Sequence, residues 1–327
     1  MWRRIILYVV CSGCGFQASA THDNDLHDAA SGDTGTGKPI DAAIDGPVAA
    51  TDCLGHWLDG TVSIAAPAEL ASLSTTGSER DPWISRDRLT LYYGVHPLAG
   101  GTSDIYRARR TATDQPFGGA TALVNLNRSD ADESRAALTP DEKMLVLASN
   151  RATGGTFDIY IITRPDTGVD FGSPDTSHLN NVNAGTASNF DPFLTPDGLR
   201  LYVAPLPGGS FQHIFVATRP NTNTDFTGLA QVPGLTSQST DADPALSLDE
   251  RIMLFSSTRN GGTGKTDLWY ATRQSTTVNF GTPKLVPGVN STSDDGDPML
   301  SADGCELYFS STRTGGDYDL YTAQVTR

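Results

Sequence analysis

Short apolar runs alternate with polar turns along most of the chain, and the same order of segments occurs five times. In the last copy, residues 297–300 (DPML) lead through a polar turn into residues 306–309 (ELYF), and a glycine pair precedes residues 319–321 (DLY). Gly and Pro interrupt the runs before the three-and-four spacing of an amphipathic helix can develop. The pattern therefore predicts short β-strands joined by tight turns.

The five copies follow one another at a nearly constant period. The turn aspartates, which lie 54, 56, 52 and 54 residues apart, are Asp87, Asp141, Asp197, Asp249 and Asp303. The first four copies add a further segment that opens with a phenylalanine, namely Phe117, Phe171, Phe226 and Phe280. Self-similarity at such a period, with four strand-like segments in each unit, is typical of the blades of a β-propeller.

The fifth copy ends before its fourth segment, and a matching segment precedes the first copy. Residues 66–70 (APAEL) align with residues 281–285 (GTPKL), which belong to the fourth segment of the fourth copy. We therefore expect an all-β fold, a five-bladed β-propeller closed by an N-terminal strand, near residues 62–72, that completes the last blade. Closure of this kind removes the exposed strand edges of an open array.

The first part of the chain differs in composition from the repeats. Residues 2–4 (WRR) and the short apolar run 5–11 precede Ser12-Gly13-Cys14, which resembles a bacterial lipoprotein signal with Cys14 as the lipidated residue; an ordinary signal peptide is the alternative. Residues 15–52 are rich in Ala, Gly, Thr and Asp and hold few large apolar residues, as a disordered tether would. We thus predict a signal peptide (1–14), a tether (15–52) and a propeller (53–327).

Two cysteines remain outside the predicted signal. They are Cys53 and Cys305, one at each end of the repeat region. In an exported protein such a pair predicts one disulfide, here between the closing strand and the last blade. We expect the protein to be an outer-membrane lipoprotein that faces the periplasm or the cell surface and contacts the membrane only through its lipid.

Charge and missing motifs exclude several classes of function. The net charge of −15 argues against nucleic acid as a partner, because binding phosphates requires clustered Lys and Arg. The sequence has no Gly-x-Ser-x-Gly nucleophile elbow, no His-Glu-x-x-His zinc motif and no phosphate-binding loop. Cations, basic peptides and neutral glycans remain as ligands.

Acidic residues recur at two fixed positions in each copy. The first strands open with Asp81, Arg135, Asp191, Asp243 and Asp297. Two residues earlier stand Glu79, Glu133, Asn189, Asp241 and Asp295. Because the first strands of a propeller line its channel, we expect both sets to gather at one mouth of the channel, where carboxylates would attract cations.

Arginines offset part of this charge. Arg151, Arg259 and Arg313 close the second strands of copies two, four and five, whereas copies one and three lack this arginine. We therefore predict a ligand site at the mouth, with Ca²⁺ as its candidate cofactor because carboxylate oxygens suit that ion. The predicted site residues are Glu79, Asp81, Asp191, Asp243, Asp297 and Arg135. The alternative is that these aspartates only fix their loops, since the motif recurs in nearly every copy.

Two copies of the repeat carry a family resemblance. Residues 297–304 (DPMLSADG) and 191–198 (DPFLTPDG) resemble the TolB-type, WD40-like β-propeller repeat, and the resemblance covers roughly residues 60 to 327. It implies protein partners in the cell envelope. We therefore predict a monomeric, non-enzymatic propeller that binds or scaffolds an envelope protein, a peptide or a glycan.

The alternative prediction is a glycan-active hydrolase. Five-bladed propellers also occur in arabinanase-like and levansucrase-like glycoside hydrolases, which use carboxylates at the channel floor. Such chemistry needs one carboxylic acid with a raised pKa and one ionised partner. Glu79, Asp81 and Asp191 are the candidates for these roles here, because they lack a nearby arginine in the repeat pattern.

Overall fold

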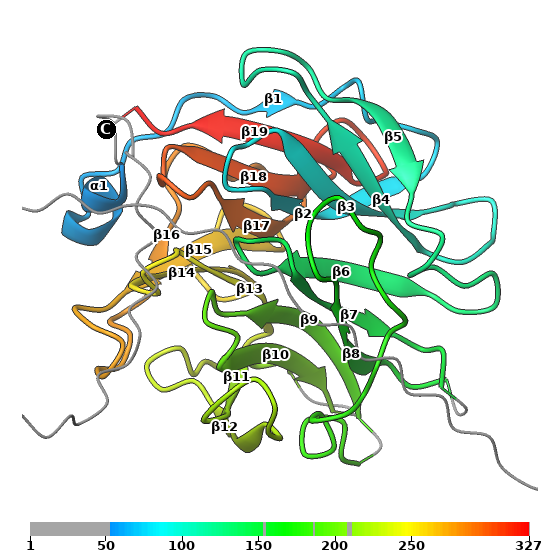
Figure 1. The fold of residues 1–327 in the computed structure, drawn as a ribbon. Helices are drawn as coiled ribbons and strands as arrows, with labels where there is room; N and C mark the ends of the chain where they lie inside the picture. The colour runs from blue at the N-terminus through cyan, green and yellow to red at the C-terminus, as the bar shows by residue number, and fades with distance from the viewer. Residues whose placement is uncertain (1–52, 153–154, 186, 208–210, 327) are drawn as a thin grey trace, which may run out of the picture. The chain divides into compact units, whose positions relative to one another are not determined.

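The computed structural model describes residues 53–152, 155–185, 187–207 and 211–326 (Figure 1). The predicted signal peptide, the lipidated Cys14 and the tether lie outside the described residues. Within the described ranges, no helix is long and apolar enough to cross a membrane.

Five small antiparallel sheets form the blades of a five-bladed β-propeller, which confirms the fold predicted from the repeats. Blade 1 consists of β2 (Ser78–Ile84), β3 (Thr90–His96), β4 (Asp104–Arg109) and β5 (Gly118–Ala122). Blade 2 consists of β6 (Glu133–Leu138), β7 (Met144–Ser149) and β8 (Asp158–Thr163). Blade 3 consists of β9 (Ser188–Leu194), β10 (Arg200–Leu206), β11 (Phe215–Thr218) and β12 (Thr227–Gln231). Blade 4 consists of β13 (Asp241–Leu246), β14 (Ile252–Ser257), β15 (Asp267–Thr272) and β16 (Lys284–Leu285). Blade 5 consists of β17 (Asp295–Leu300), β18 (Glu306–Ser311), β19 (Asp319–Gln324) and the N-terminal β1 (Ala68–Glu69).

Blade 2 departs from the predicted four strands. Its fourth position holds a single bridge, in which Ile161 and Asp175 exchange backbone hydrogen bonds of 2.8 and 2.9 Å. Pro174 directly precedes the bridge and has no N–H to donate. The three remaining strands of this blade pair as expected.

The second strands of the blades supply much of the core. β14 and β18 are buried along their whole length, and Phe255 and Tyr308 on these strands are inaccessible to solvent. These continuous apolar runs are buried on both faces because each blade packs between two neighbours. The core therefore follows the ring and holds the blades, and hence the channel, in fixed positions.

The N-terminal segment closes the ring as predicted. Figure 1 shows β1 alongside β19, where Ala68 pairs with Thr322 and Glu69 with Tyr321. A further bridge joins Ile64 to Val325. The last blade is therefore built from both ends of the repeat region.

A disulfide and a short helix reinforce this closure. The expected bond between Cys53 and Cys305 is present, with the two Cα atoms 5.0 Å apart. Helix α1 (Leu54–Asp59) follows at once and buries Trp57 completely. The Trp57 indole N–H donates to the carbonyl of Gly304 at 3.0 Å, and its ring packs edge-on against Tyr270. The disulfide is also typical of an exported protein.

Four arginines that directly follow third strands fasten the fourth segments. Each guanidinium carbon lies 4.2 to 4.4 Å from the centre of a phenylalanine ring, in the pairs Arg110–Phe117, Arg164–Phe171, Arg219–Phe226 and Arg273–Phe280. Each Nε also donates to a backbone carbonyl of the turn between the first and second strands of its blade. Each arginine thus combines a cation–π contact with a hydrogen bond and pins the outer segment of its blade.

Every first strand contains a β-bulge at the same place. The strand register shifts there, and the bulge residues have positive φ angles of 50° to 57°, namely Asp81, Arg135, Asp191, Asp243 and Asp297. A bulge turns a side chain away from the ordinary alternation of the strand. In this propeller it directs these five side chains together in the central channel.

Candidate functional site

The bulge residues form one cluster in the channel. One carboxylate oxygen from each of Asp81, Asp191 and Asp243 lies within 4.8 Å of the other two. The Arg135 Nη1 atom lies 3.6 Å from both Asp81 Oδ1 and Asp243 Oδ1, and 3.7 Å from Asp297 Oδ1. Three carboxyl groups therefore surround the Arg135 guanidinium, in a setting where fewer than one-sixth of each ion-paired side chain is exposed.

Backbone hydrogen bonds hold the cluster rigidly. The Asp81 carboxylate accepts from the backbone N–H of Arg135 at 3.2 Å, so blade 1 is tied to blade 2. The same bond runs from Asp243 to the carboxylate of Asp191 and from Asp297 to that of Asp243, each at 3.4 Å. Each of these three carboxylates therefore binds the bulge of the next blade rather than its own loop. The cluster is pre-organised.

The environment moves the pKa values of these carboxyls in opposite directions. Burial, together with the charge of Asp297, raises the pKa of Asp81 to about 8. Burial and the charge of Asp243 raise the pKa of Asp191 well above its ordinary value, and burial raises the pKa of Asp243 to about 6. Burial alone would also raise the pKa of Asp297, but Arg80, Arg135 and a hydrogen bond from Ser310 hold that pKa below its usual range.

The cluster borders a cavity of about 420 Å³ in the channel. Its lining combines acidic, aromatic and small polar side chains, including Asp81, Asp191, Asp243, Asp297, Arg80, Phe157, Phe190, Thr240, Thr258, Thr266 and Tyr318. This volume lies within the range of small-molecule sites, and a few polar groups in a partly apolar wall are their usual chemistry.

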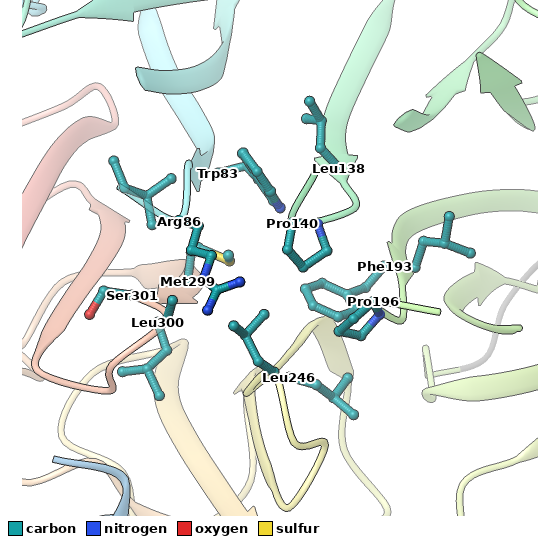
Figure 2. Close-up of a pocket in the computed structure, with 14 residues that line it drawn as sticks. Trp83, Arg86, Leu138, Pro140, Phe193, Pro196, Leu246, Met299, Leu300 and Ser301 are labelled. Carbon is teal, nitrogen blue, oxygen red and sulfur yellow. The ribbon is translucent and has the colours of Figure 1, made fainter. Parts of the chain in front are cut away.

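An apolar layer lies further along the same first strands. Figure 2 shows Trp83, Phe193 and Met299 converging there with Leu138 and Leu246, so that all five blades contribute. These side chains are at most 9% exposed and enclose a pocket of only about 30 Å³. This layer narrows the channel beyond the aspartates and separates them from the turns at the other end.

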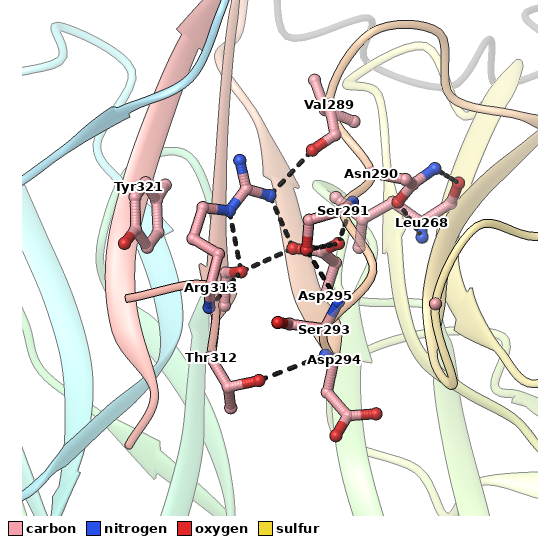
Figure 3. A network of polar contacts seen from close by, with 12 residues as sticks. Leu268, Val289, Asn290, Ser291, Ser293, Asp294, Asp295, Thr312, Arg313 and Tyr321 are labelled. Atoms are coloured by element: carbon pink, nitrogen blue, oxygen red, sulfur yellow. Dashed lines mark hydrogen bonds and ion pairs between the residues drawn. The ribbon is translucent and has the colours of Figure 1, made fainter. Parts of the chain in front are cut away.

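The second predicted set of carboxylates does not join the cluster. Figure 3 shows that Asp295 instead accepts hydrogen bonds from Ser291 and Arg313, and Arg313 Nη2 lies 2.5 Å from Asp295 Oδ1. The hydroxyl of Ser311 donates to the same Oδ1 at 2.6 Å. Arg313 also donates to the carbonyl of Val289 at 2.7 Å. The prediction that the Asp295 carboxylate converges with the channel aspartates is therefore wrong, because the serine and arginine of its own blade bind it as a loop anchor.

Asp241 and Glu133 are bound in the same way in blades 4 and 2. Asp241 accepts from Ser257 and Arg259 at 2.6 and 2.5 Å, and Glu133 accepts from Ser149 and Arg151 at 2.8 Å each. The arginines expected to balance the mouth thus balance this outer set. Among the described residues they form no ion pair with the aspartates in the channel.

Glu79 occupies the equivalent position in blade 1, where Val95 and Pro97 replace the serine and the arginine. Its side chain is completely buried, accepts a hydrogen bond from Thr75 Oγ1 at 2.5 Å, and leaves Oε2 without a partner. Burial raises the pKa of Glu79 above its ordinary value. Glu79 does not line the cavity, so of the six predicted site residues the structure brings together Asp81, Asp191, Asp243, Asp297 and Arg135.

Sequence reasoning missed the residues immediately before the bulges. These side chains all line the cavity and differ in every blade: Arg80, Ser134, Phe190, Ala242 and Gly296. The available signal was variation at one position of an otherwise regular repeat. Side chains that vary on a constant strand and bulge backbone indicate positions that could determine which ligand the cavity binds.

Comparisons with known proteins connect this fold to two groups of propellers. No protein-family model matches the sequence, and no curated protein matches it. A thermostable family-43 glycoside hydrolase shares the fold at a TM-score of 0.54 and 13% identity, over 77% of this chain and 93% of that chain. The catalytic domain of a family-62 α-L-arabinofuranosidase from Coprinopsis cinerea gives 0.54 and 11%, over 81% and 96%. TolB from Acinetobacter baumannii gives 0.43 and 16%, over 77% and 56%.

These findings correct the main functional prediction. The expected non-enzymatic binding or scaffold propeller is wrong on two grounds. The propellers that match at a TM-score of 0.54 are glycoside hydrolases, although at these identities the likeness is one of fold. The channel also holds a buried acidic cluster with divergent pKa values, as the hydrolase alternative requires.

Proposed function

We propose that the protein is a glycoside hydrolase whose active site is the cluster of aspartates in the channel. The observation that supports this most strongly is the opposite displacement of two pKa values in one cavity. The pKa of Asp81 is raised to about 8 by burial, whereas arginines hold the pKa of Asp297 low despite its burial. At neutral pH the site therefore contains a carboxylic acid and a carboxylate at once, which is the pair that glycoside hydrolysis uses.

In this proposal the two carboxyls have separate roles. Asp81 donates its proton to the glycosidic oxygen as the bond between that oxygen and the anomeric carbon breaks. Asp297 presents its ionised carboxylate to the positive charge that develops on the sugar ring. A water molecule then bonds to the anomeric carbon through its oxygen and gives one proton to Asp81, which restores the acid and completes the hydrolysis. Arg135 is a positioning residue, because its guanidinium lies 3.7 Å from Asp297 and 3.6 Å from Asp81 and lowers the pKa of both carboxyls.

The proposed substrate is a glycan with a pentofuranosyl branch. The family-62 relative in fold is named as an α-L-arabinofuranosidase, and the cavity of about 420 Å³ has room for a sugar unit. A single residue of this kind could enter the channel while the rest of the glycan stays outside. The apolar layer around Trp83 limits how deep it can go.

Hydrolysis of aryl α-L-arabinofuranosides, arabinan and arabinoxylan by the purified full chain tests the proposal. We expect Asp81→Asn and Asp297→Asn each to lower kcat by about 100-fold or more, the first through loss of the general acid and the second through loss of the carboxylate that stabilises the developing positive charge. The matched control is Asp130→Asn, because Asp130 is exposed and pairs only with Arg128 at the surface. Absence of hydrolysis across all three substrates, or full activity in Asp297→Asn, would refute the proposed function.

We also propose that the enzyme is an exported, monomeric lipoprotein anchored through Cys14. The disulfide between Cys53 and Cys305 supports export. Metabolic labelling with a fatty acid tests the anchor, since wild-type protein should take up the label and Cys14→Ser should not. Labelling of Cys14→Ser to the same degree would reject Cys14 as the site.

The candidate cofactor Ca²⁺ has a partial fit to the cluster. Three carboxylate oxygens within 4.8 Å of one another are compatible with ligands at about 2.3–2.6 Å from one ion. However, Arg135 already contacts two of these carboxylates, and burial favours their protonated forms. We propose that Ca²⁺ binds this site only in competition with protons, and thus more tightly at high pH.

A further inference from the structure

The five seams between the blades share one backbone arrangement at the mouth of the channel. At every seam, the first strand of one blade donates a backbone N–H to a residue shortly before the third strand of the preceding blade; in four blades this residue directly precedes the strand, and in blade 3 Gln212 lies three residues before β11. The five bonds measure 2.7 to 3.0 Å and join Glu133 to Ser103, Asn189 to Phe157, Asp241 to Gln212, Asp295 to Thr266 and Glu79 to Tyr318. Because this backbone hydrogen bond is present at all five seams, the seams differ from one another mainly in their side chains.

The side chains beside this constant bond differ from seam to seam. Each seam presents one residue before a third strand and one residue before a bulge, in the pairs Ser103 with Ser134, Phe157 with Phe190, Gln212 with Ala242, Thr266 with Gly296 and Tyr318 with Arg80. Nine of these ten residues line the cavity, and the exception is Ser103. Three seams are thus small or polar, and two are bulky.

The two bulky seams form walls of different chemistry. Between blades 2 and 3, the rings of Phe157 and Phe190 pack with their centres 4.7 Å apart. Between blades 5 and 1, the Arg80 guanidinium carbon lies 3.6 Å from the centre of the Tyr318 ring. One seam separates the walls on one side of the ring and two seams separate them on the other, and the side chains at these three seams are small or polar.

Arg80 differs from the other arginines beside the carboxylates. Arg135 has three carboxylate neighbours and Arg313 is bound to Asp295, whereas Arg80 forms no ion pair with any described carboxylate. Its Nε is buried without a hydrogen-bond acceptor. Arg80 lowers the pKa of Asp297 without forming an ion pair with it, and its planar guanidinium is stacked on an aromatic ring. A cation in this position is suited to binding a carboxylate from a ligand.

We propose that the mouth binds an acidic glycan chain, with a sugar ring against Phe190 and Phe157 and a uronic acid carboxylate at Arg80. This inference deepens the proposed function and rests on it for the role of the site. The aromatic wall supplies the apolar contact that a sugar face needs. The cationic wall favours a negatively charged sugar.

Binding measured by isothermal titration calorimetry tests this without requiring hydrolysis. The probes are galacturonate and glucuronoxylan oligosaccharides, each compared with the same oligosaccharide after methyl esterification of its carboxylates. We expect the full chain to bind at least one of the acids about tenfold more tightly than its ester, as a charge-assisted hydrogen bond provides. Equal affinity for acid and ester with both probes would overturn the proposal.

Two variants assign the effect to the two walls. Arg80→Gln should abolish the preference for the acid while leaving the affinity for the ester within about twofold, because only the charge is removed. Phe190→Ala should weaken acid and ester alike, by about fivefold or more. The control is Arg107→Gln, which removes the same charge from blade 1 at a site outside this cavity. Retention of the full acid preference in a folded Arg80→Gln would also overturn the proposal.

The binding data separate this inference from the proposed function. Acid preference that depends on Arg80, without hydrolysis of any substrate, supports the recognition site and rejects the hydrolase. Hydrolysis that depends on Asp297, with equal affinity for acid and ester, supports the hydrolase and rejects the acidic substrate.

Discussion

Removing the disulfide that closes the ring should produce the largest single loss of stability outside the core. Cys53 and Cys305 are 252 residues apart in the sequence. In the chain-entropy description, a cross-link that closes a loop of this length removes about 5 kcal/mol of unfolded-state entropy at 25 °C. For a domain of this size, about 1 kcal/mol corresponds to a change in Tm of about 2–4 °C. We therefore expect Cys53→Ser/Cys305→Ser to melt about 10–20 °C below the wild type.

The variant should still fold, because other contacts also close the ring. β1 pairs with β19 through Ala68 and Glu69, and the N–H groups of Ala65 and Leu70 donate to this strand at 2.8 Å each. Trp57 remains buried between blades 4 and 5. The loss thus measures the covalent link rather than the whole closure.

Equilibrium unfolding in guanidinium chloride, followed by tryptophan fluorescence, is the appropriate assay. The single variant Cys53→Ser and the reduced wild type are controls, and both should match the double variant because all three lack the bond. A loss below about 1 kcal/mol in the double variant would refute the entropic account. It would mean that the unfolded chain was already restricted or that strand pairing alone sets the stability.

Three further predictions concern the channel. Burial raises the pKa of Asp81 to about 8 and that of Asp243 to about 6. The stability that these two groups contribute is therefore complete below about pH 4 and is lost as the pH rises through their pKa values. We expect the wild-type Tm to fall between about pH 5 and about pH 9, and the Tm of Asp81→Asn to fall less over the same range. A wild-type Tm that rises over this range would contradict the assigned directions. Arg135→Ala should lower the free energy of unfolding, measured by urea titration, by about 3–5 kcal/mol, since it leaves several buried carboxyls without their cation. A loss below about 1 kcal/mol would show that protonation of these carboxyls compensates for the missing cation. Addition of about 5 mM Ca²⁺ should raise the Tm more at about pH 9 than at about pH 6, because the ion competes with protons, and an equal shift at both values would place any bound ion elsewhere.

Repetition in the sequence was sufficient to predict the blades and their closure. The period fixed five units, and the match of residues 66–70 to residues 281–285 located β1, which the structure pairs with β19. The cysteine pair also followed from its position at the two ends of the ring. These features depend on the order of segments along the chain, and that order can be read from a regular repeat in the sequence.

The division of the acidic residues between two roles could not be predicted from spacing. Positions 295 and 297 are both acidic and only two residues apart, so strand alternation places them on one side. The bulge at Asp297, with φ 54°, directs this side chain into the channel, while Ser311 and Arg313 hold Asp295 in its own blade. A change of one backbone dihedral therefore separates a candidate catalytic group from a loop anchor.

The arginines that stack on the fourth segments recur at a constant spacing in the sequence, which alone does not predict the stacked contact. Each lies seven residues before the phenylalanine that opens its segment, as with Arg110 before Phe117 and Arg273 before Phe280. The spacing is constant, but a stacked contact depends on where the two segments meet in the folded blade. The absent fourth strand of blade 2, beside Pro174, shows the same dependence on local backbone geometry.

The exception in the ring of bulge residues explains how the site can contain both an acid and a carboxylate. Arg135 keeps the left-handed backbone of its four counterparts, with φ 50°, so the bulge belongs to the blade and the side chain can vary. An aspartate at this position would add a fifth buried carboxyl and remove the cation that lies within 3.7 Å of three others. Burial would then favour the neutral form of every member, with Arg80 as the remaining counter-charge. Arg135 thus acts together with Arg80 and the Ser310 hydrogen bond to keep Asp297 ionised beside a protonated Asp81, so the proposed chemistry depends in part on the one blade that departs from the repeat.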